Sequence, residues 1–296
     1  MKPARFEYAA PRTTQDALAL LARHGLGAKV LAGGQSLVPV LNFRLAKPSV
    51  LIDLNGIPGL DTIEVDPKTG EVVIGALARQ SDVERAPVVA RANPLLVEAL
   101  RHVGHRTIRN RGTVVGSLAH ADPAAELPLV LVTQGGRVKL ANARRERWVA
   151  AREFFVSYLT TALEPDELVI EARFPALDPS AGWALEEFSR RSGDFALVAA
   201  CVTLAIAHGL VERCAIGIAG GGPTPARAVD AESALIGQEP SDVAIADAAA
   251  QAATGCEFDS DIHGSAEFRR ELAQTMVSRA LRAARARQAS AEPAAG

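Results

Sequence analysis

The sequence predicts an α+β fold divided into several lobes. The chain has 296 residues, of which 48% are hydrophobic and 22% charged, and a chain of this length and composition can bury more than one core. The expected strands and helices are grouped by segment, whereas a long βαβ array would alternate them regularly. The sequence also contains no internal repeat that would indicate a solenoid.

The first segment, residues 1–57, is expected to form a β-α-β lobe. Thr13 is placed to cap a helix that has an apolar face, and Gly25 is placed to end it. The apolar runs in "KVLAGG" and "SVLIDL" predict two strands that follow the helix. The glycine and proline near residue 57 mark the end of this lobe.

The second segment, residues 58–178, is expected to combine strands and helices. "EVVIGAL", "GRVKLA" and "DELVIEARFP" are rich in β-branched residues, which favours strands. "LLVEALRHVG" has the apolar spacing of a helix and ends in glycine. The unusual stretch "TIRNRGTVVGSLAHADPAAELPLVLVTQ" lies between that helix and the later strands.

The third segment, residues 179–288, is expected to be a smaller α+β domain with an antiparallel sheet and helices. "WALEEFSRRSGDFALVAACVTLAI" predicts two strands joined around Ser192 and Gly193. "RCAIGIAGGG" predicts a further strand that ends in a glycine turn, and "AEFRRELAQTMVSRALRAARARQ" predicts a long amphipathic helix. Residues 289–296 are expected to form a disordered tail.

Composition argues against several classes of protein. The net charge of −2 gives no basic surface for nucleic acid, and no run approaches the roughly 20 apolar residues of a transmembrane helix. The three cysteines are scattered without a C-x-x-C pair, which argues against a zinc site or an iron–sulfur cluster on this chain. His102, His105 and His120 lack a further placed ligand, so no metal site is expected. We expect a cytoplasmic protein, because the N-terminus has no apolar signal core.

Two glycine-bearing turns suggest an anion site. Ala32–Leu37 reads "AGGQSL", and Gly112–Ser117 reads "GTVVGS". Exposed backbone N–H groups in such turns bind anions, and the hydroxyls of Ser36, Thr113 and Ser117 add donors. Neither G-x-G-x-x-G after a strand nor G-x-x-x-x-G-K-[ST] occurs. Two such turns without a lysine clamp suit the pyrophosphate of a dinucleotide better than a nucleoside triphosphate.

Each of these features also has a plainer interpretation. A Gly-Gly pair is often a simple turn, and Asp122 with Pro123 is equally suited to a turn or to the start of a helix, with Asp122 as its N-cap. In the functional interpretation, Asp122 and Glu126 lie just beyond the second turn and accept hydrogen bonds from a ribose. The occurrence of both turns in one chain favours the functional interpretation.

Three stretches carry a resemblance to a known family. "AGGQSL", "NRGTVVGSLAHADPAAELP" and "RRSGDFALVA" occur in this order and resemble the FAD-binding medium subunit of molybdenum hydroxylases, the xanthine oxidase and aerobic carbon monoxide dehydrogenase family. The resemblance continues through nearly the whole chain. It implies a two-lobed FAD-binding domain of the PCMH/VAO type, followed by the smaller C-terminal domain, and FAD bound without a covalent link.

The resemblance also implies which residues would bind FAD. The loops 32–37 and 113–117 would hold the pyrophosphate, while Glu126 and nearby Asp122 would bind the ribose next to adenine. The backbone near Leu168 would bind the polar edge of the isoalloxazine ring, beside the loop 190–194. The predicted cofactor-binding residues are Ala32, Gly33, Gly34, Gln35, Ser36, Leu37, Thr113, Gly116, Ser117, Asp122, Glu126, Leu168, Arg190 and Asp194. No side chain is assigned as an acid–base catalyst.

The chain departs from the family pattern at three points. Glu186 stands where the xanthine oxidase branch carries a lysine near the flavin, which leaves open what balances charge at the ring. Val115 replaces the first glycine of the usual T-x-G-G, so one backbone approach is expected to be less close. The four-cysteine iron–sulfur insertion of the hydroxybenzoyl-CoA reductase branch is missing from the sequence, which argues against that branch.

The resemblance implies a role in electron transfer. In this family a large molybdopterin subunit oxidises the substrate, and a small subunit passes the electrons through [2Fe–2S] clusters to FAD. This chain would be the FAD subunit of a heterotrimer or of a dimer of heterotrimers, inactive alone toward the organic substrate. One alternative is a stand-alone FAD-dependent reductase or oxidase, which would need a proton donor near the flavin. Ser189 and Ser192 are candidates for it, but a structural role in a turn suits both of them better. The other alternative is a binding or assembly protein that has lost its flavin.

Overall fold

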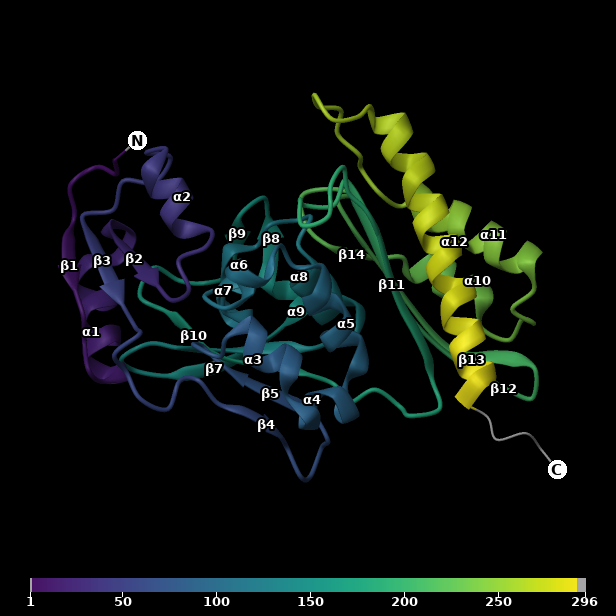
Figure 1. Ribbon diagram of the computed structural model, residues 1–296, viewed down its shortest axis with the longest axis horizontal. Coiled ribbons are helices and arrows are strands. Elements are labelled where there is room, and N and C mark those ends of the chain that lie inside the picture. The colour runs from purple at the N-terminus through teal and green to yellow at the C-terminus, as the bar shows by residue number, and fades with distance from the viewer. Residues whose placement is uncertain (1, 292–296) are drawn as a thin grey trace.

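The N-terminal lobe contains a small parallel sheet. The computed structural model describes residues 2–291, and its first strands pair in the order β1-β3-β2 with both pairs parallel (Figure 1). The elements of this lobe are β1 (Glu7–Ala9), α1 (Thr14–His24), the 3-10 turn η1 (Gly25–Gly27), β2 (Ala28–Leu31), α2 (Leu37–Asn42) and β3 (Val50–Asp53). The β-α-β arrangement is as predicted, and β1 is an additional strand that the sequence analysis did not identify.

The predicted ends of α1 are confirmed. The Thr13 hydroxyl accepts a hydrogen bond from the Asp16 N–H at 3.1 Å and so caps the helix. Gly25 follows the last turn with a φ of +50°, a conformation that glycine adopts without steric cost. Ala17, Leu18 and Leu21 pack the buried face of the helix against the sheet.

The second lobe is an antiparallel sheet covered by helices (Figure 1). Its five strands are arranged in the order β4-β5-β10-β6-β7. The strands are β4 (Ile63–Val65), β5 (Val72–Gly75), β6 (Arg137–Ala141), β7 (Glu146–Ala150) and β10 (Leu168–Phe174). The helices are α3 (Gln80–Arg85), α4 (Pro87–Ala92), α5 (Pro94–His102), α6 (Arg106–Arg109), α7 (Val114–His120), α8 (Glu126–Thr133) and α9 (Ala151–Phe154). A short hairpin, β8 (Phe155–Ser157) and β9 (Thr160–Thr161), precedes β10.

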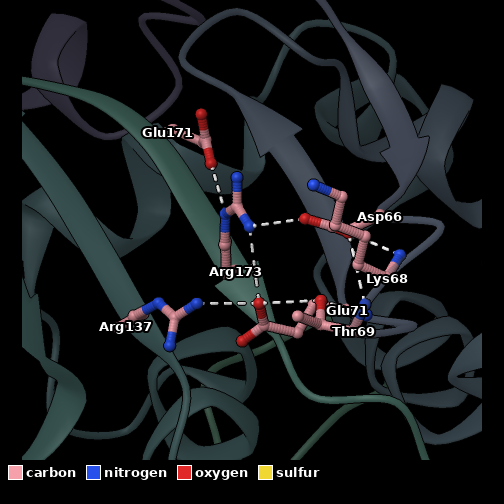
Figure 2. Close-up of polar contacts among 7 residues, drawn as sticks. All are labelled: Asp66, Lys68, Thr69, Glu71, Arg137, Glu171 and Arg173. Atoms are coloured by element: carbon pink, nitrogen blue, oxygen red, sulfur yellow. Dashed lines mark hydrogen bonds and ion pairs between the residues drawn. The ribbon is translucent and has the colours of Figure 1, made fainter.

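A network of charged side chains joins the β4–β5 hairpin to the neighbouring strands (Figure 2). Arg173 on β10 contacts Asp66 at 2.9 Å and Glu171 at 2.6 Å. Glu71, at the other end of the hairpin turn, contacts Arg137 on β6 at 2.8 Å. These ion pairs therefore hold the β4–β5 hairpin against β10 and β6, in agreement with the register of the backbone hydrogen bonds between β5 and β10.

The C-terminal domain is a four-stranded antiparallel sheet backed by helices (Figure 1). Its strands are β11 (Gly182–Phe188), β12 (Val198–Ala207), β13 (Leu210–Ala219) and β14 (Ala226–Arg227). Its helices are α10 (Val229–Leu235), α11 (Asp242–Thr254) and α12 (Ala266–Ala291). The pairing of β11 with β12 confirms the predicted strand pair around residues 192–193.

Helix α12 is longer than predicted. It packs against β11 and β12, and its residues Ala280, Leu281 and Ala284 are fully buried. Residues 289–291, expected to belong to a disordered tail, are instead the last residues of this helix, and residues 292–296 lie outside the described residues. The alanine-rich sequence continues the helix because alanine has the highest helix propensity.

Helix α8 joins the second lobe to the C-terminal domain. Every residue of α8 is buried, including Glu126 and Thr133 at its two ends, as expected of a helix with packing partners on all sides. It packs against α5 within its own lobe and against β12 and β13 of the C-terminal domain. Across residues 2–291, no helix has both the length and the apolar character needed to cross a membrane.

Candidate functional site

A cavity of about 740 Å³ lies where the three parts of the chain meet. The loop after β2, the start of α7, the β9–β10 region and the loop between β11 and β12 form its walls. Most of the predicted cofactor-binding residues line it, namely Ala32, Gly33, Gly34, Gln35, Ser36, Leu37, Thr113, Gly116, Ser117, Asp122, Glu126, Leu168 and Asp194. The structure therefore brings together residues that lie far apart in the sequence.

Arg190 is the exception among the predicted residues. Its side chain is exposed, and it is not among the described residues that line the cavity. Asp194, from the same loop, does line the cavity. Glu186, which stands in place of the family lysine, is half-buried on β11 and is likewise not part of the cavity wall in the described structure.

The first loop supplies backbone donors. Gly34 has a φ of +73°, which reverses the chain direction between β2 and α2. Within residues 2–291, no acceptor bonds the backbone N–H groups of residues 33–37. The first N–H to be satisfied after them is that of Val38, which bonds the Gly34 carbonyl at 2.9 Å. The loop can therefore donate several hydrogen bonds to an anionic ligand.

The second loop, expected from the sequence to be a glycine-bearing turn, is the start of helix α7. Thr113 is the N-cap of α7, and its Oγ1 accepts a hydrogen bond from the Gly116 N–H at 3.1 Å. A Cβ at Gly116 would collide with this hydroxyl, so the cap itself requires glycine there. Val114 and Val115 are buried, which fixes the first turn of the helix against the core. The Thr113 cap and the burial of Val114 and Val115 therefore stabilise this glycine-containing segment as the first turn of a helix.

Gly33 brings the two loops into contact. A Cβ at Gly33 would collide with the Arg111 carbonyl oxygen and would lie 2.8 Å from the Gly112 Cα. The backbone of the second loop therefore occupies the space that a side chain at residue 33 would need. From the sequence, the absence of a Cβ at Gly33 was expected to let a ligand come close, whereas in the structure it lets the second loop come close.

Arg79 and Asn55 link the same two loops through side chains. The Arg79 guanidinium donates one hydrogen bond to the Arg111 carbonyl and another, at 2.6 Å, to the Asn55 Oδ1. The Asn55 Nδ2 in turn donates to the Ala32 carbonyl at 2.9 Å. These two residues were missed by the sequence analysis, because nothing in a single sequence indicates that residues 55 and 79 meet.

Asp53 anchors this link to the parallel sheet. Its Oδ1 accepts hydrogen bonds from Asn55, and its Oδ2 accepts one from the Tyr8 hydroxyl at 2.5 Å. Burial opposes ionisation of Asp53, but the hydrogen bonds from Tyr8 and Asn55 outweigh it and hold its pKa below the usual value. Asp53 therefore stays ionised and orients Asn55.

Glu126 is a buried carboxyl group in the cavity wall. Only 5% of the residue is exposed, and this burial raises its pKa to about 7. The charge of Glu187 raises it further, while His102 lowers it. His102 lies 3.7 Å from Glu187, whose hydrogen bond raises the pKa of the imidazole against the effect of burial. With a pKa of about 7, the carboxyl group titrates near neutral pH in the folded chain.

Asp122 closes a turn and does not cap a helix, so of the two plainer interpretations of its sequence context the turn is the one observed. Its Oδ1 accepts a hydrogen bond from the Ala124 N–H at 2.9 Å and so closes a turn. Helix α8 begins later, at Glu126, after the N-cap position Ala125. Both carboxyl groups, Asp122 and Glu126, line the cavity.

The far end of the cavity is bounded by the loop between β11 and β12. Gly193 has a φ of +87° and lies against the His105 ring, where a Cβ would come within 2.5 Å of the Cε1 atom. Phe195, from the same loop, lines the cavity although it is 60% exposed. Leu168, at the start of β10, is buried in the opposite wall.

Other residues of the cavity wall were not identified from sequence. They include Gln80, His120, Leu159, Thr160, Thr161 and Phe195. Burial lowers the pKa of His120, although nearby Asp122 opposes the shift. His120 lies inside a stretch that the sequence analysis singled out, whereas Gln80 had no motif to mark it. Among the described residues, no three His, Cys, Asp or Glu side chains are grouped to hold a metal ion.

Comparison with known proteins identifies the class. Residues 4–177 match the family model for the FAD-binding domain in molybdopterin dehydrogenases, and residues 183–284 match that for the C-terminal domain of the CO dehydrogenase flavoprotein. The chain therefore belongs to the family of FAD-binding medium subunits of carbon monoxide dehydrogenase and related molybdenum hydroxylases. The predicted family, the α+β fold class and FAD as the cofactor are confirmed.

Individual relatives are similar over almost the full length. The chain is 42% identical to the 6-hydroxypseudooxynicotine dehydrogenase complex subunit alpha of Paenarthrobacter nicotinovorans, over 95% of both chains. It is 37% identical to the carbon monoxide dehydrogenase medium chain of Hydrogenophaga pseudoflava, over 97% of this chain and 99% of that one. The solved quinoline 2-oxidoreductase of Pseudomonas putida 86 matches with a TM-score of 0.92 and 35% identity, over 97% of this chain and 100% of that one.

Proposed function

We propose that this chain is the FAD-carrying electron-transfer subunit of a multi-subunit molybdenum hydroxylase. It accepts electrons from [2Fe–2S] clusters of a partner subunit and passes them to an external acceptor. The observation that carries the proposal is the cavity, which gathers the glycine loop, the Thr113 cap and the Glu126 carboxyl group in a chain of this family. The chain's relatives include subunits named for dehydrogenase complexes and medium chains.

The residues of the cavity fit the chemistry of FAD. The free N–H groups of residues 33–37 and the hydroxyl of Ser117 suit a pyrophosphate, which accepts several hydrogen bonds at once. The carboxyl groups of Asp122 and Glu126 suit the hydroxyls of a ribose. A cavity of about 740 Å³ is also within the usual range for a site that binds a small molecule or cofactor.

FAD supplies the redox chemistry when it is bound, and the chain supplies binding, orientation and electrostatics. Residues 32–37 and 113–117 hold the phosphates, and Glu126 holds the ribose by accepting hydrogen bonds. The backbone at Leu168 holds the polar edge of the ring, and the loop with Asp194 limits the access of water. Arg190 is exposed and does not line the cavity, so we assign it no contact with FAD.

We infer partner subunits from the same relatives. A large molybdopterin subunit and a small [2Fe–2S] subunit would complete a heterotrimer or a dimer of heterotrimers, and the chain alone would not turn over the organic substrate. We also propose the division of the chain at residues 57 and 178. The three hydrophobic clusters support it in outline, although Leu77, Ala141 and Leu168 of the second segment pack in the N-terminal cluster. The cytoplasmic location stays a prediction from the sequence.

The first loop is tested by Gly34→Asp. The added carboxylate would repel the pyrophosphate, and the side chain at a φ of +73° would crowd Leu31 and Val38. We expect FAD retention to be lost, as measured by the visible absorption spectrum of the purified protein and by identification of the released flavin.

Gly59→Asp is the matched control for Gly34→Asp. Gly59 has a φ of +78° and open space around it, and it is exposed away from the cavity. The same strain and charge at this position should leave one FAD per chain. Stoichiometric FAD in Gly34→Asp would show that the first loop is placed wrongly. A wild-type chain that stays colourless with added FAD would favour the binding or assembly protein, and turnover by the isolated chain would favour the stand-alone enzyme.

A further inference from the structure

Gln80 is a buried side chain for which the described structure provides no partner. It is the first residue of α3, and only 4% of it is exposed. Its Oε1 is completely buried without a hydrogen bond, and no described residue bonds its Nε2. An amide buried in this way costs stability, since it gives up its hydrogen bonds to water.

The surroundings of Gln80 show which atom a ligand can reach. The backbone N–H of Gln80 bonds the Gly112 carbonyl at 2.9 Å, which ties the residue to the second loop. Its Oε1 is covered by Gly112, where an added Cβ would lie only 2.5 Å away. Gln80 nevertheless lines the cavity. The amide nitrogen is therefore the polar atom on the cavity side.

We propose that Gln80 is a cofactor-binding residue, and that its Nε2 donates a hydrogen bond to an oxygen of FAD where the cofactor passes the second loop. The inference rests on the proposed FAD site and adds to it a side-chain donor that no motif marks. The bound oxygen gives the Nε2 atom a partner that the described structure does not provide. Gln80 thus stabilises the loaded chain at the expense of the apoprotein.

Gln80→Met tests the proposal, because methionine keeps the length of the side chain and removes both polar atoms. We expect the apoprotein to unfold at the same temperature as wild type or at a higher one, since no hydrogen bond within the described structure is lost. We expect the dissociation constant for FAD to rise about tenfold, the equivalent of one hydrogen bond. Flavin fluorescence during titration of apoprotein measures the binding, and circular dichroism measures the unfolding.

Gln134→Met is the matched control. Gln134 is a partly buried glutamine outside the cavity wall, and it accepts a hydrogen bond from the Asn93 amide at 2.8 Å. This variant should show the opposite behaviour, with a less stable apoprotein and unchanged affinity for FAD. Gln80→Glu adds a second test, because it keeps the acceptor oxygens and removes the donor. We expect it to bind FAD at least as weakly as Gln80→Met.

The outcomes separate this proposal from the proposed function. Wild-type affinity in either Gln80 variant would overturn the donor role while leaving FAD binding intact. A parallel loss of apoprotein stability and FAD affinity in Gln80→Met would assign Gln80 a structural role and would also overturn it. Failure of the wild-type apoprotein to bind FAD would overturn the proposed function, and this inference with it.

Discussion

At the scale of single residues, the protonation of Glu126 gives the apoprotein a definite dependence on pH. Burial raises the pKa of Glu126 from an ordinary value of 4.5 to about 7 in the folded chain, so the folded state binds its proton more tightly than the unfolded state does. The contribution of Glu126 to the free energy of unfolding is therefore fully present below pH 4.5 and is lost as the pH rises to about 7. Glu187 and Asp122 raise this pKa, and His102 lowers it.

Glu126→Gln should remove that dependence, because glutamine stays neutral throughout. We expect the free energy of unfolding of wild-type apoprotein, relative to Glu126→Gln, to fall by up to about 3 kcal/mol between pH 4.5 and pH 7. Chemical denaturation of both apoproteins at several pH values measures the difference. Parallel stability curves across this range would contradict the assignment.

The sequence predicts site residues only where a motif marks them. "AGGQSL" and the segment from Thr113 to Glu126 are recognisable as stretches, and the structure places them on one cavity. Gln80 has no such pattern around it. Its importance follows from its burial and its missing hydrogen bonds, which are properties of the folded chain alone.

At the scale of elements, the second loop shows where local signals compete. The glycines of "GTVVGS" favour a turn, but Thr113 caps a helix, and Val114, Val115 and Leu118 hold that helix against the core. Tertiary packing of these apolar residues outweighs the low helix propensity of glycine and valine. A short helix of this kind is hard to predict from sequence because its stability comes from the rest of the lobe.

The link between Asn55 and Arg79 should set the spacing of the two loops, and hence the affinity for FAD. Asn55→Ala and Arg79→Met each break the connection from the Ala32 carbonyl to the Arg111 carbonyl. We expect each single variant to bind FAD about five- to tenfold more weakly. The loss of binding free energy in the double variant should be about 1 kcal/mol smaller than the sum of the two single losses. Titration of the wild-type and variant apoproteins with FAD measures the affinities for this double-mutant cycle.

Arg85→Met is the control for that cycle. Arg85 lies on α3 close to Arg79 in sequence, but its contact with Asp82 is largely exposed. Surface ion pairs of this kind contribute little to stability, so FAD affinity should not change. Full additivity of Asn55→Ala and Arg79→Met would show that the two side chains act independently of each other.

At the scale of the whole molecule, the sequence predicts the parts better than their arrangement. The lobes follow from local hydrophobic patterns, since each strand and helix has its own period. The arrangement of the lobes depends on contacts between residues about a hundred positions apart, such as the Tyr158 hydroxyl with Asp259 at 2.5 Å and the Gly220 N–H with the Pro123 carbonyl at 3.0 Å. The family resemblance supplied this arrangement, because the residue pattern alone left the relative positions of the lobes open.

The joint between α8 and the C-terminal sheet is the contact that decides this arrangement. Gly217 on β13 has no Cβ, and an added one would collide with the Thr133 hydroxyl and lie 2.9 Å from the Leu129 Cδ1. We therefore expect Gly217→Ala to lower the free energy of unfolding by about 1–3 kcal/mol through overpacking. Thr133→Ala removes the colliding hydroxyl, so the double variant should be more stable than the sum of the single effects predicts.

Gly255→Ala provides the control for this joint, because a Cβ at Gly255 meets only the Ala252 carbonyl at an ordinary 3.7 Å. Its φ of −76° is also allowed for alanine, so the stability should stay the same or rise slightly. Chemical denaturation of all four variants measures these differences. Additive losses in Gly217→Ala and Thr133→Ala would mean that α8 and β13 are not in direct contact. Because α8 has Glu126 in the cavity and Thr133 at the joint, Gly217→Ala should also weaken FAD binding, and the double variant should bind FAD more tightly than Gly217→Ala does.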